Sequence, residues 1–240
     1  MTKKLNFTVL TIFPEMFPGP VGQSITGNAL EEGLWSMYVV NIRDFAIDQH
    51  STVDDRPFGG GSGMVMKPDV LSNAIESLEK IDRLIYMSPR GKPLNQELVE
   101  EISSSGNVGI ICGRYEGIDE RVINEFDIEE LSVGDYVLSG GEIGAFSLID
   151  ACVRQISGVL GNPEAVLEES FGSGGYKNLL EYPHYTRPAD WKGKKVPEVL
   201  LSGNHEDIQS WRFNKALEIT KERRKDLWRK YELQKGAKEK

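Results

Sequence analysis

The chain has 240 residues, of which 39% are hydrophobic, and a formal net charge of −9. This length fits one large domain, or one main domain with a small appendage, and the apolar fraction is sufficient for a packed core. No apolar run approaches the ~18 residues of a membrane span, and the start, MTKKLNFTVL, lacks the apolar region of a secretory signal. The two cysteines, Cys112 and Cys152, lie in apolar surroundings, as buried free thiols of a reducing compartment would. We therefore expect a cytoplasmic protein without a membrane partner.

Strands and helices are predicted to alternate along the first two thirds of the chain. Short segments rich in β-branched and aromatic residues predict strands at 5–13, 37–42, 83–87, 107–112 and 128–133. Apolar residues at helical spacing predict helices at 68–80, 94–102, 119–126 and 143–159. This alternation indicates an α/β domain with a largely parallel sheet over residues 1–160.

The rest of the chain has a different character. Residues 161–183 are rich in Gly, Glu and Ser without periodicity, which predicts a flexible linker or an active-site lid. Beyond it, Asn204 is expected to cap a helix, and residues 221–233 continue helically with Lys and Arg on one side. Residues 184–240 are therefore expected to form a small basic helical domain.

Charge is divided unevenly between these parts. Residues 1–184 hold 13 Lys and Arg against 28 Asp and Glu, a net charge of −15, whereas residues 185–240 hold 15 against 9, a net charge of +6. A basic end piece on an acidic body favours contact with RNA, DNA or an acidic membrane surface. A solvated helical face is the alternative that charge alone leaves open.

Several common kinds of site are excluded by their missing motifs. The chain contains neither GxxxxGK[ST] nor GxSxG, and GGGSGM (59–64) misses the dinucleotide-binding pattern at its last position. His50, His184 and His205 are widely spaced, and neither cysteine has a CxxC partner, so a structural zinc site is not expected.

Three unusual loops follow predicted strands, at 88–93, 113–117 and 134–141. Open α/β sheets bind ligands at the carboxyl ends of their strands. Glycine in such loops lets a ligand approach the main chain, whose N–H and C=O groups could bind an adenine edge. Any one of these loops could be an ordinary tight turn, but the three together favour a ligand site. None of the loops resembles a phosphate site, because basic residues are few in them.

Five motifs together resemble the bacterial tRNA (guanine-N1)-methyltransferases, a family of the SPOUT class: DDRPFGGGSGMVMK, YMSPRG, GRYEGIDER, SVGDYVLSGGE and PHYTRP. They occur in the family's order, and the resemblance extends from TIFPEMF (11–17) to GNHEDIQSWR (203–212). It implies an α/β parallel-sheet fold with a deep trefoil knot and a small helical C-terminal domain. A knot is contrary to the general rule for protein chains, and no periodicity predicts it. The implied reaction is methyl transfer from S-adenosylmethionine to N1 of guanosine at tRNA position 37, beside the anticodon.

The resemblance assigns the methyl donor to the three loops, which would wrap it in a bent conformation. The glycines of 134–141 would then permit the tight turns of a knotted chain as well as backbone contact with adenine and ribose. The residues expected to bind S-adenosylmethionine are Tyr86, Ser88, Pro89, Gly113, Tyr115, Val133, Gly134, Asp135, Tyr136, Val137, Leu138, Gly140 and Gly141.

The chemistry of the reaction defines the catalytic residues that are needed. The sulfonium methyl is already activated, so the enzyme mainly aligns the reacting groups. Guanine N1 must lose a proton, which requires a base, and the charge that develops on O6 requires a cation or donor. The family assigns the cation role to the arginine that matches Arg154, the one basic residue of LIDACVRQISGVL. An ion-paired or snorkelling core arginine is the alternative.

The expected base is the point where this sequence departs from the family pattern. The family usually has Asp-Ser-Phe here, whereas the chain has Glu169, Ser170 and Phe171. Glutamate keeps the carboxylate but extends one methylene further, so the backbone must compensate. We predict Glu169 as the base, with the adjacent Glu168 as its competitor.

The remaining expectations concern the substrate side. The residues expected at the target guanine or on the anticodon stem-loop of the tRNA are Glu116, Arg56, Phe58, Gly59, His184, Tyr185, Arg187 and Arg212. Glu116 could instead pair with Arg114 or Arg121. The resemblance also implies a homodimer with a composite active site, a linker that orders on tRNA binding, and a magnesium requirement for which the sequence shows no dedicated cage.

Two alternative functions remain open. A SPOUT methyltransferase for another RNA nucleoside would keep the donor loops but not PHYTRP or the DRPFGGGSGM loop. A non-catalytic RNA-binding module would need neither Arg154 nor a carboxylate at position 169, and it would not bind S-adenosylmethionine.

Overall fold

The computed structural model describes residues 4–162 and 165–238. The predicted ranges 1–160, 161–183 and 184–240 include residues 1–3, 163–164 and 239–240, which lie outside the described residues. The chain divides into two compact units, Met1–Gly161 and Asn162–Lys240. Within the described ranges, no helix is both long and apolar enough to cross a membrane.

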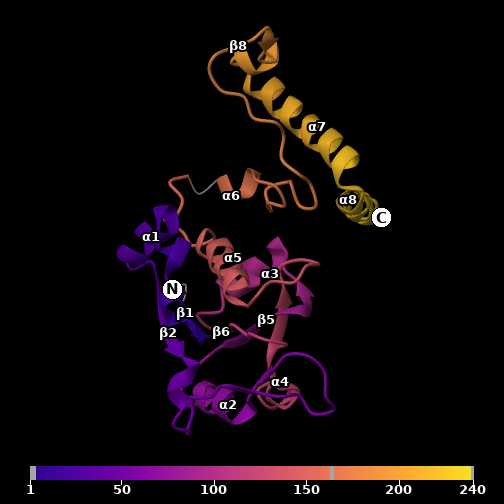
Figure 1. Ribbon diagram of the computed structural model, residues 1–240. Helices are drawn as coiled ribbons and strands as arrows, with labels where there is room; N and C mark the ends of the chain where they lie inside the picture. The colour runs from indigo at the N-terminus through magenta and orange to yellow at the C-terminus, as the bar shows by residue number, and fades with distance from the viewer. Residues whose placement is uncertain (1–3, 163–164, 239–240) are drawn as a thin grey trace. The chain divides into compact units, whose positions relative to one another are not determined.

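A parallel five-stranded sheet forms the centre of the first unit (Figure 1), with the strand order β2-β1-β6-β5-β7. Its strands are β1 (Leu5–Thr11), β2 (Trp35–Asn41), β5 (Arg83–Pro93), β6 (Asn107–Ile111) and β7 (Glu129–Ser132). The predicted α/β class with a parallel sheet is therefore confirmed. Because β6, β5 and β7 are neighbours, the loops that follow β6 and β7 meet the last part of β5 at one edge of the sheet.

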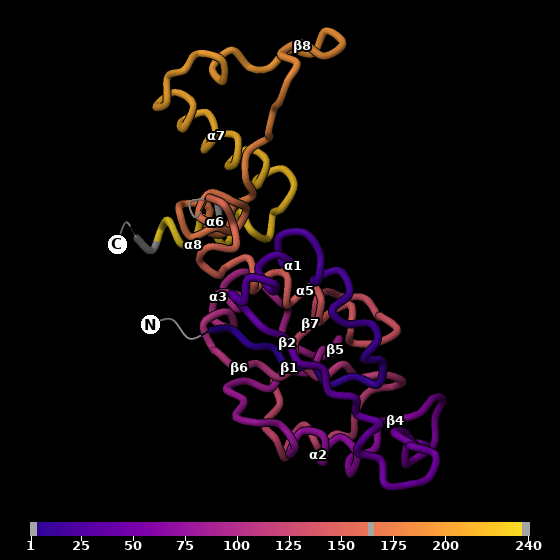
Figure 2. The backbone as a smooth tube through the Cα atoms, turned by 90° about the vertical axis from the view of Figure 1, so that its left-hand side faces the viewer, coloured from indigo at the N-terminus to yellow at the C-terminus, as the bar shows by residue number. Residues whose placement is uncertain are grey.

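Helices cover both faces of this sheet (Figures 1 and 2). One face packs against α1 (Ser24–Glu31), α3 (Gln96–Ser103) and α5 (Glu142–Val153), and the other against α2 (Pro68–Glu76) and α4 (Glu120–Glu125). Successive side chains of a strand point to opposite faces of the sheet, so each strand contributes to both hydrophobic layers. In β1, Phe7 and Val9 face the α5 layer, while Leu10 faces the α2 layer.

Short elements connect these layers. They are the 3-10 helices Pro14–Met16, Gly19–Gly22 and Ile42–Phe45, and the antiparallel strands β3 (Asp54–Asp55) and β4 (Val65–Met66). Their few residues carry too little periodicity to predict them from the sequence.

The predicted helix at 68–80 forms, but it ends earlier. Pro68 occupies the first turn of α2, and Val70, Leu71 and Ala74 are buried as expected. The helix ends at Glu76, where the Ser77 hydroxyl donates to the Ala74 carbonyl at 2.7 Å. Similarly, α5 ends at Val153 rather than near residue 159.

The turn predicted after residue 87 is instead part of a strand. β5 continues to Pro93, and its register against β7 shifts between Met87 and Lys92, which both pair with Leu131. The intervening residues bulge out of the strand, and Gly91 returns so close to β7 that a Cβ there would collide with the Glu130 backbone. A bulge redirects side chains without ending the strand, and the turn chemistry of SPRGKP produces this one.

The second unit contains α6 (Ala165–Glu168), the strands β8 (Asp190–Trp191) and β9 (Lys194–Lys195), the 3-10 helix Glu198–Leu201, α7 (His205–Arg223) and α8 (Lys225–Lys238). Asn204 caps α7 as predicted, since its side-chain oxygen accepts the Glu206 N–H at 3.2 Å. Arg224 has non-helical dihedral angles and separates α7 from α8.

Part of the segment predicted as a flexible linker packs into the core of this unit. Tyr176 and Leu179 are buried with Ala216 of α7. The Leu180 N–H donates to the buried hydroxyl of Thr220 at 2.8 Å. Composition alone could not predict this packing, because the partners lie on a helix that follows much later in the chain.

Candidate functional site

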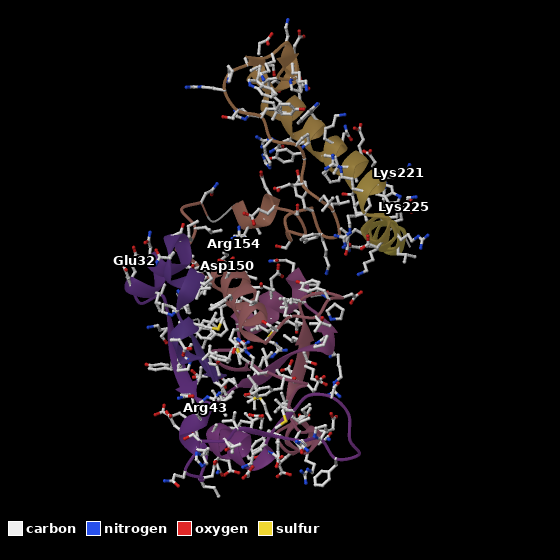
Figure 3. The ribbon with its side chains drawn as sticks, in the orientation of Figure 1. Glu32, Arg43, Asp150, Arg154, Lys221 and Lys225 are labelled. Carbon is white, nitrogen blue, oxygen red and sulfur yellow. The ribbon has the colours of Figure 1, made fainter. Side chains whose placement is uncertain are left out.

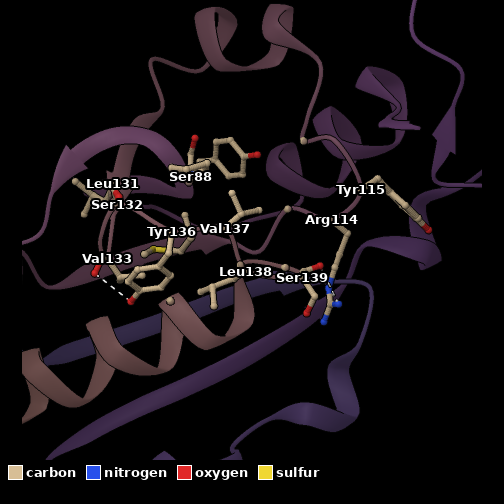
Figure 4. Close-up of a pocket in the computed structure, with 18 of the residues that line it drawn as sticks. Ser88, Arg114, Tyr115, Leu131, Ser132, Val133, Tyr136, Val137, Leu138 and Ser139 are labelled. Carbon is tan, nitrogen blue, oxygen red and sulfur yellow. Dashed lines mark hydrogen bonds between the residues drawn. The ribbon is translucent and has the colours of Figure 1, made fainter. Parts of the chain in front are cut away.

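A cavity of about 300 Å³ opens at the bulge of β5 and at the ends of β6 and β7 (Figure 4). It is lined by residues of β5 and β7, by the loops that follow β6 and β7, and by Gly144 of α5. Every residue that the sequence assigned to the methyl donor lines this cavity except Asp135. The structure thus brings the three predicted loops together, while their binding of the donor remains a prediction.

Two glycines allow the loops to approach one another closely. The Gly141 N–H donates to the Gly113 carbonyl at 2.9 Å, and a Cβ at Gly141 would lie 2.8 Å from the Cα of Cys112. A Cβ at Gly113 would lie 2.6 Å from the ring of Tyr86. Any side chain at these positions would therefore push apart the loops that form the cavity.

Apolar side chains form an exposed wall of the cavity (Figure 4). Tyr136, Val137 and Leu138 line it although they are 57%, 87% and 37% exposed. The Tyr136 hydroxyl donates to the Val133 carbonyl at 3.2 Å. Exposed apolar groups in a concave site suit a flat heterocyclic ligand. Tyr86 is buried, and burial raises the pKa of its phenol, which keeps it neutral.

A buried ion pair lies at one side of the cavity. The Glu142 side chain is 1% exposed, and its Oε2 lies 2.9 Å from Nη2 of Arg114. The Thr11 hydroxyl donates to Glu142 Oε1 at 2.8 Å. The Arg114 guanidinium lies 4.4 Å from the ring centroid of Phe13 and donates to the Ser139 carbonyl at 3.2 Å (Figure 4). This network joins the end of β1 to two of the cavity loops.

The sequence interpretation missed this network, although Arg114, Ser139 and Glu142 lie within the motifs that it used. Arg114 and Ser139 line the cavity. The available signal was a carboxylate at the start of the apolar helix α5, where a buried charge requires a partner.

Glu116 lies in the same cavity, beside the loop that was expected to flank the target base. The Glu116 N–H donates to the Met64 carbonyl at 2.9 Å, and a Cβ at Gly63 would collide with the Glu116 side chain. Arg56, Phe58 and Gly59 are exposed on this loop between β3 and β4, Phe58 to 99%.

The arginines that could have paired with Glu116 have other partners. Arg114 pairs with Glu142, and Arg121 lies 2.8 Å from Asp119.

The two residues predicted to be catalytic belong to different units. Arg154 follows α5 in the first unit, where its N–H donates to the Asp150 carbonyl at 3.2 Å (Figure 3). Glu169 follows α6 in the second unit. Both side chains are partly buried. Neither unit by itself brings this pair together.

The other substrate-side residues gather beside α7 in the second unit. His184 Nε2 lies 3.4 Å from Glu181, and the Tyr185 ring lies 6.2 Å from that of Trp211. Arg212 lies 4.9 Å from the Tyr182 ring centroid and 3.9 Å from Glu168. The carboxylate of Glu168, the competitor for the role of base, therefore has a cationic partner.

Arg187, the last of the substrate-side residues, is exposed.

In the part of the chain that the structure describes, no three His, Cys, Asp or Glu residues converge in a way that could hold a metal ion.

Comparisons with known proteins identify the family of the chain. Residues 5–230 match the family described as tRNA (Guanine-1)-methyltransferase TrmD. The chain is 55% identical over 228 residues to a tRNA (guanine-N(1)-)-methyltransferase of Rhodospirillum rubrum, covering 95% of this chain and 94% of that protein. Proteins of the same name from Anaplasma marginale (strain Florida) and Brucella ovis are 54% and 52% identical, covering 92% and 95% of this chain and 93% of each relative. The chain belongs to the tRNA (Guanine-1)-methyltransferase family.

Proposed function

We propose that this protein transfers a methyl group from S-adenosylmethionine to N1 of the guanosine at position 37 of tRNA. The observation that carries the proposal is the glycine-built cavity at the bulge of β5 and the carboxyl ends of β6 and β7, in a chain of this family. Its exposed apolar wall suits the adenine of the donor, and its close backbones supply N–H and C=O groups for hydrogen bonding. The tRNA substrate makes the cytoplasm the expected location.

The donor, when bound, supplies an activated methyl group. The residues of this chain must then align guanine N1 with that methyl and accept the N1 proton. Glu169 accepts this proton, and Arg154 stabilises the negative charge that develops on O6. Glu116 holds the guanine, because it lines the donor cavity and also contacts the exposed loop between β3 and β4.

We infer a homodimer in which the active site is composite. The support is the distribution of the functional groups, since the cavity and Arg154 lie in the first unit while Glu169 and the basic helices lie in the second. Residues 184–240 bind the anticodon stem-loop through His184, Tyr185, Arg187 and Arg212.

We also infer that the chain forms a deep trefoil knot at the donor cavity. The support is the contact of the loop 134–141 with the backbone that follows β6, through the Gly141 to Gly113 hydrogen bond of 2.9 Å. In such a knot, the same glycines permit both the crossing of the chain and the approach of the donor.

The test is methyl transfer from labelled S-adenosylmethionine to tRNA transcripts that carry guanosine or adenosine at position 37. The wild type should modify only the guanosine transcript. Loss of a general base lowers the rate by about 10²–10⁴-fold, so Glu169→Ala should be nearly inactive while donor affinity is kept.

Glu168→Ala is the matched control, because it removes the neighbouring carboxylate, which is paired with Arg212. It should retain most of the activity. An active Glu169→Ala variant together with an inactive Glu168→Ala variant would assign the role of base to Glu168. Donor binding without transfer to either transcript would rule out the substrate assignment.

A further inference from the structure

The hairpin formed by β8 and β9 carries an exposed aromatic and basic surface next to Arg187, and its residues 190–195 are not among the residues assigned to tRNA binding. It lies at the end of the second unit opposite α8 (Figures 1 and 2). Residues 184–195 are all exposed. Between residues 187 and 195 the chain has four basic side chains, Arg187, Lys192, Lys194 and Lys195, against the single acid Asp190.

Trp191 is the centre of this surface. Its side chain is 56% exposed, and the ammonium groups of Lys192 and Lys194 lie 5.0 Å and 6.0 Å from its ring centroid. Trp191 pairs directly with Lys194 across the hairpin, which places the two side chains on one face. A large exposed ring flanked by cations combines a stacking surface with binding groups for an anion.

The hairpin turn holds one of these lysines in an unfavourable conformation. Lys192 and Gly193 have φ values of +54° and +77°, as in the two-residue turn that favours Asn, Asp or Gly. The carboxylate of Asp190 accepts the Gly193 N–H at 2.9 Å and closes the turn. Since a side chain in the left-handed region is costly, the lysine at this position points to a use for its ammonium group.

We propose that this hairpin binds the RNA substrate, with Trp191 stacked on an unpaired base and Lys192, Lys194 and Lys195 on the flanking phosphates. Aromatic rings beside basic side chains are a recurrent way to bind single-stranded RNA. The positive charge of residues 185–240 complements a polyanion. The inference rests on the proposed function, because it assumes that the substrate is tRNA.

The test is binding of a tRNA transcript at several salt concentrations to the full-length protein and to hairpin variants. Loss of a stacked base should weaken binding about tenfold in Trp191→Ala, whereas Trp191→Phe should retain most of the affinity. The double variant Lys192→Ala/Lys194→Ala should lower the slope of log K against log salt by about one for each lost phosphate contact.

Lys80→Ala is the matched control, because Lys80 is an exposed lysine of the first unit. It should leave both affinity and salt slope unchanged. All hairpin variants should bind S-adenosylhomocysteine like the wild type, since the cavity lies in the first unit, and their KM for tRNA should rise.

The possible failures are distinguishable. A wild type that methylates no tRNA would contradict the proposed function itself. A wild type that methylates tRNA, with hairpin variants of unchanged KM and salt slope, would contradict only the role of the hairpin. Hairpin variants that bind tRNA like the wild type but bind anionic lipid vesicles more weakly than the wild type would also overturn the inference. That result would indicate that the hairpin contacts a membrane instead.

Discussion

The cavity of the first unit and the surface of the second are built on opposite principles. Around the cavity, backbones lie in direct contact at Gly141 and Gly113, and the ion pair of Arg114 with Glu142 is nearly removed from water. In the second unit, the candidate binding groups are side chains at the surface, such as Trp191 and Arg187. The close backbone contacts around the cavity leave almost no room for larger side chains, whereas the exposed surface of the second unit can accept many substitutions.

This difference matches two kinds of ligand. A small donor with a flat heterocycle is recognised by shape and by hydrogen bonds to a preformed main chain, so its site must be rigid. An RNA is bound mainly through phosphates and stacked bases, for which exposed cations and rings suffice. Substitutions should therefore affect stability and donor affinity together in the first unit, but tRNA binding alone at the second unit's surface.

The largest effect is expected from Arg114→Met. It leaves the Glu142 carboxylate buried without its cation, and breaking a buried pair in this way typically costs about 3–5 kcal/mol. Donor affinity should fall as well, because the Ser139 carbonyl of the cavity loop loses its guanidinium donor. Urea denaturation and titration with S-adenosylhomocysteine measure the two effects.

A double variant and an exposed pair serve as controls for this prediction. Arg114→Met/Glu142→Gln should recover part of the lost stability, because no unpaired charge remains and the amide oxygen still accepts from Thr11. Arg224→Met, at the exposed pair with Asp226, should change stability little. Equal stability of Arg114→Met and the wild type would show that the ion pair does not stabilise the fold.

Gly141→Ala should have the next largest effect. The new methyl would lie 2.8 Å from the Cα of Cys112, which is backbone and cannot rotate away. Overpacking of this kind typically costs about 1–3 kcal/mol, and the displaced loop should bind the donor at least about tenfold more weakly, equivalent to 1.4 kcal/mol.

Gly161→Ala is the matched control, since a Cβ at Gly161 meets no atom within 4 Å. It should leave both thermal stability and donor affinity unchanged. Normal donor binding by Gly141→Ala would show that the cavity loops are not held by backbone contact.

Thr220→Val tests a place where the second unit resembles the first. The Thr220 hydroxyl is buried, accepts the Leu180 N–H at 2.8 Å and donates to the Ala216 carbonyl at 2.7 Å. Removing it deletes both hydrogen bonds and leaves the Leu180 N–H without its acceptor, which should cost about 1–3 kcal/mol. Hydrogen exchange of residues 176–182 should become faster, while donor affinity should stay the same.

Thr220→Ser keeps the hydroxyl and should behave like the wild type. Fast exchange of residues 176–182 already in the wild type would mean that this segment is not held by α7, as the sequence-based prediction of a flexible linker assumed.

The contrast between the two units also explains what the sequence could predict. A local sequence pattern predicts a feature that depends on a single element, such as the start of a helix. Examples are Pro68 in the first turn of α2 and the Asn204 cap of α7. The loops after β6 and β7 were predictable because their glycines follow apolar strands, whereas the loop predicted at 88–93 is part of β5.

What the sequence could not predict depends on contacts between distant residues. Thr11 and Glu142 are 131 positions apart, so no window of the sequence contains both. The bulge in β5 requires β7 as its partner. The burial of Tyr176 and Leu179 requires α7. In each case the missing information is the identity of the partner, not the propensity of the segment.

The smallest expected effect concerns the two buried thiols, which report on the rigidity of the first unit without changing it. Burial raises the pKa of the Cys152 thiol to about 12 and that of Cys112 well above its usual range. An unfolded thiol ionises near pH ~8.5, so these groups favour the folded state below that pH, and the contribution is lost as pH rises toward 12.

A disulfide reagent at pH 8 should therefore label both thiols only as fast as the fold opens. Two variants that each keep one of these thiols separate their labelling. S-adenosylhomocysteine should slow the labelling of Cys112 in Cys152→Ser, because Cys112 lies against Gly141. It should slow the labelling of Cys152 in Cys112→Ser less. Immediate labelling of either thiol, or equal protection of both, would contradict a donor cavity whose rigidity comes from the backbone contact at Gly141.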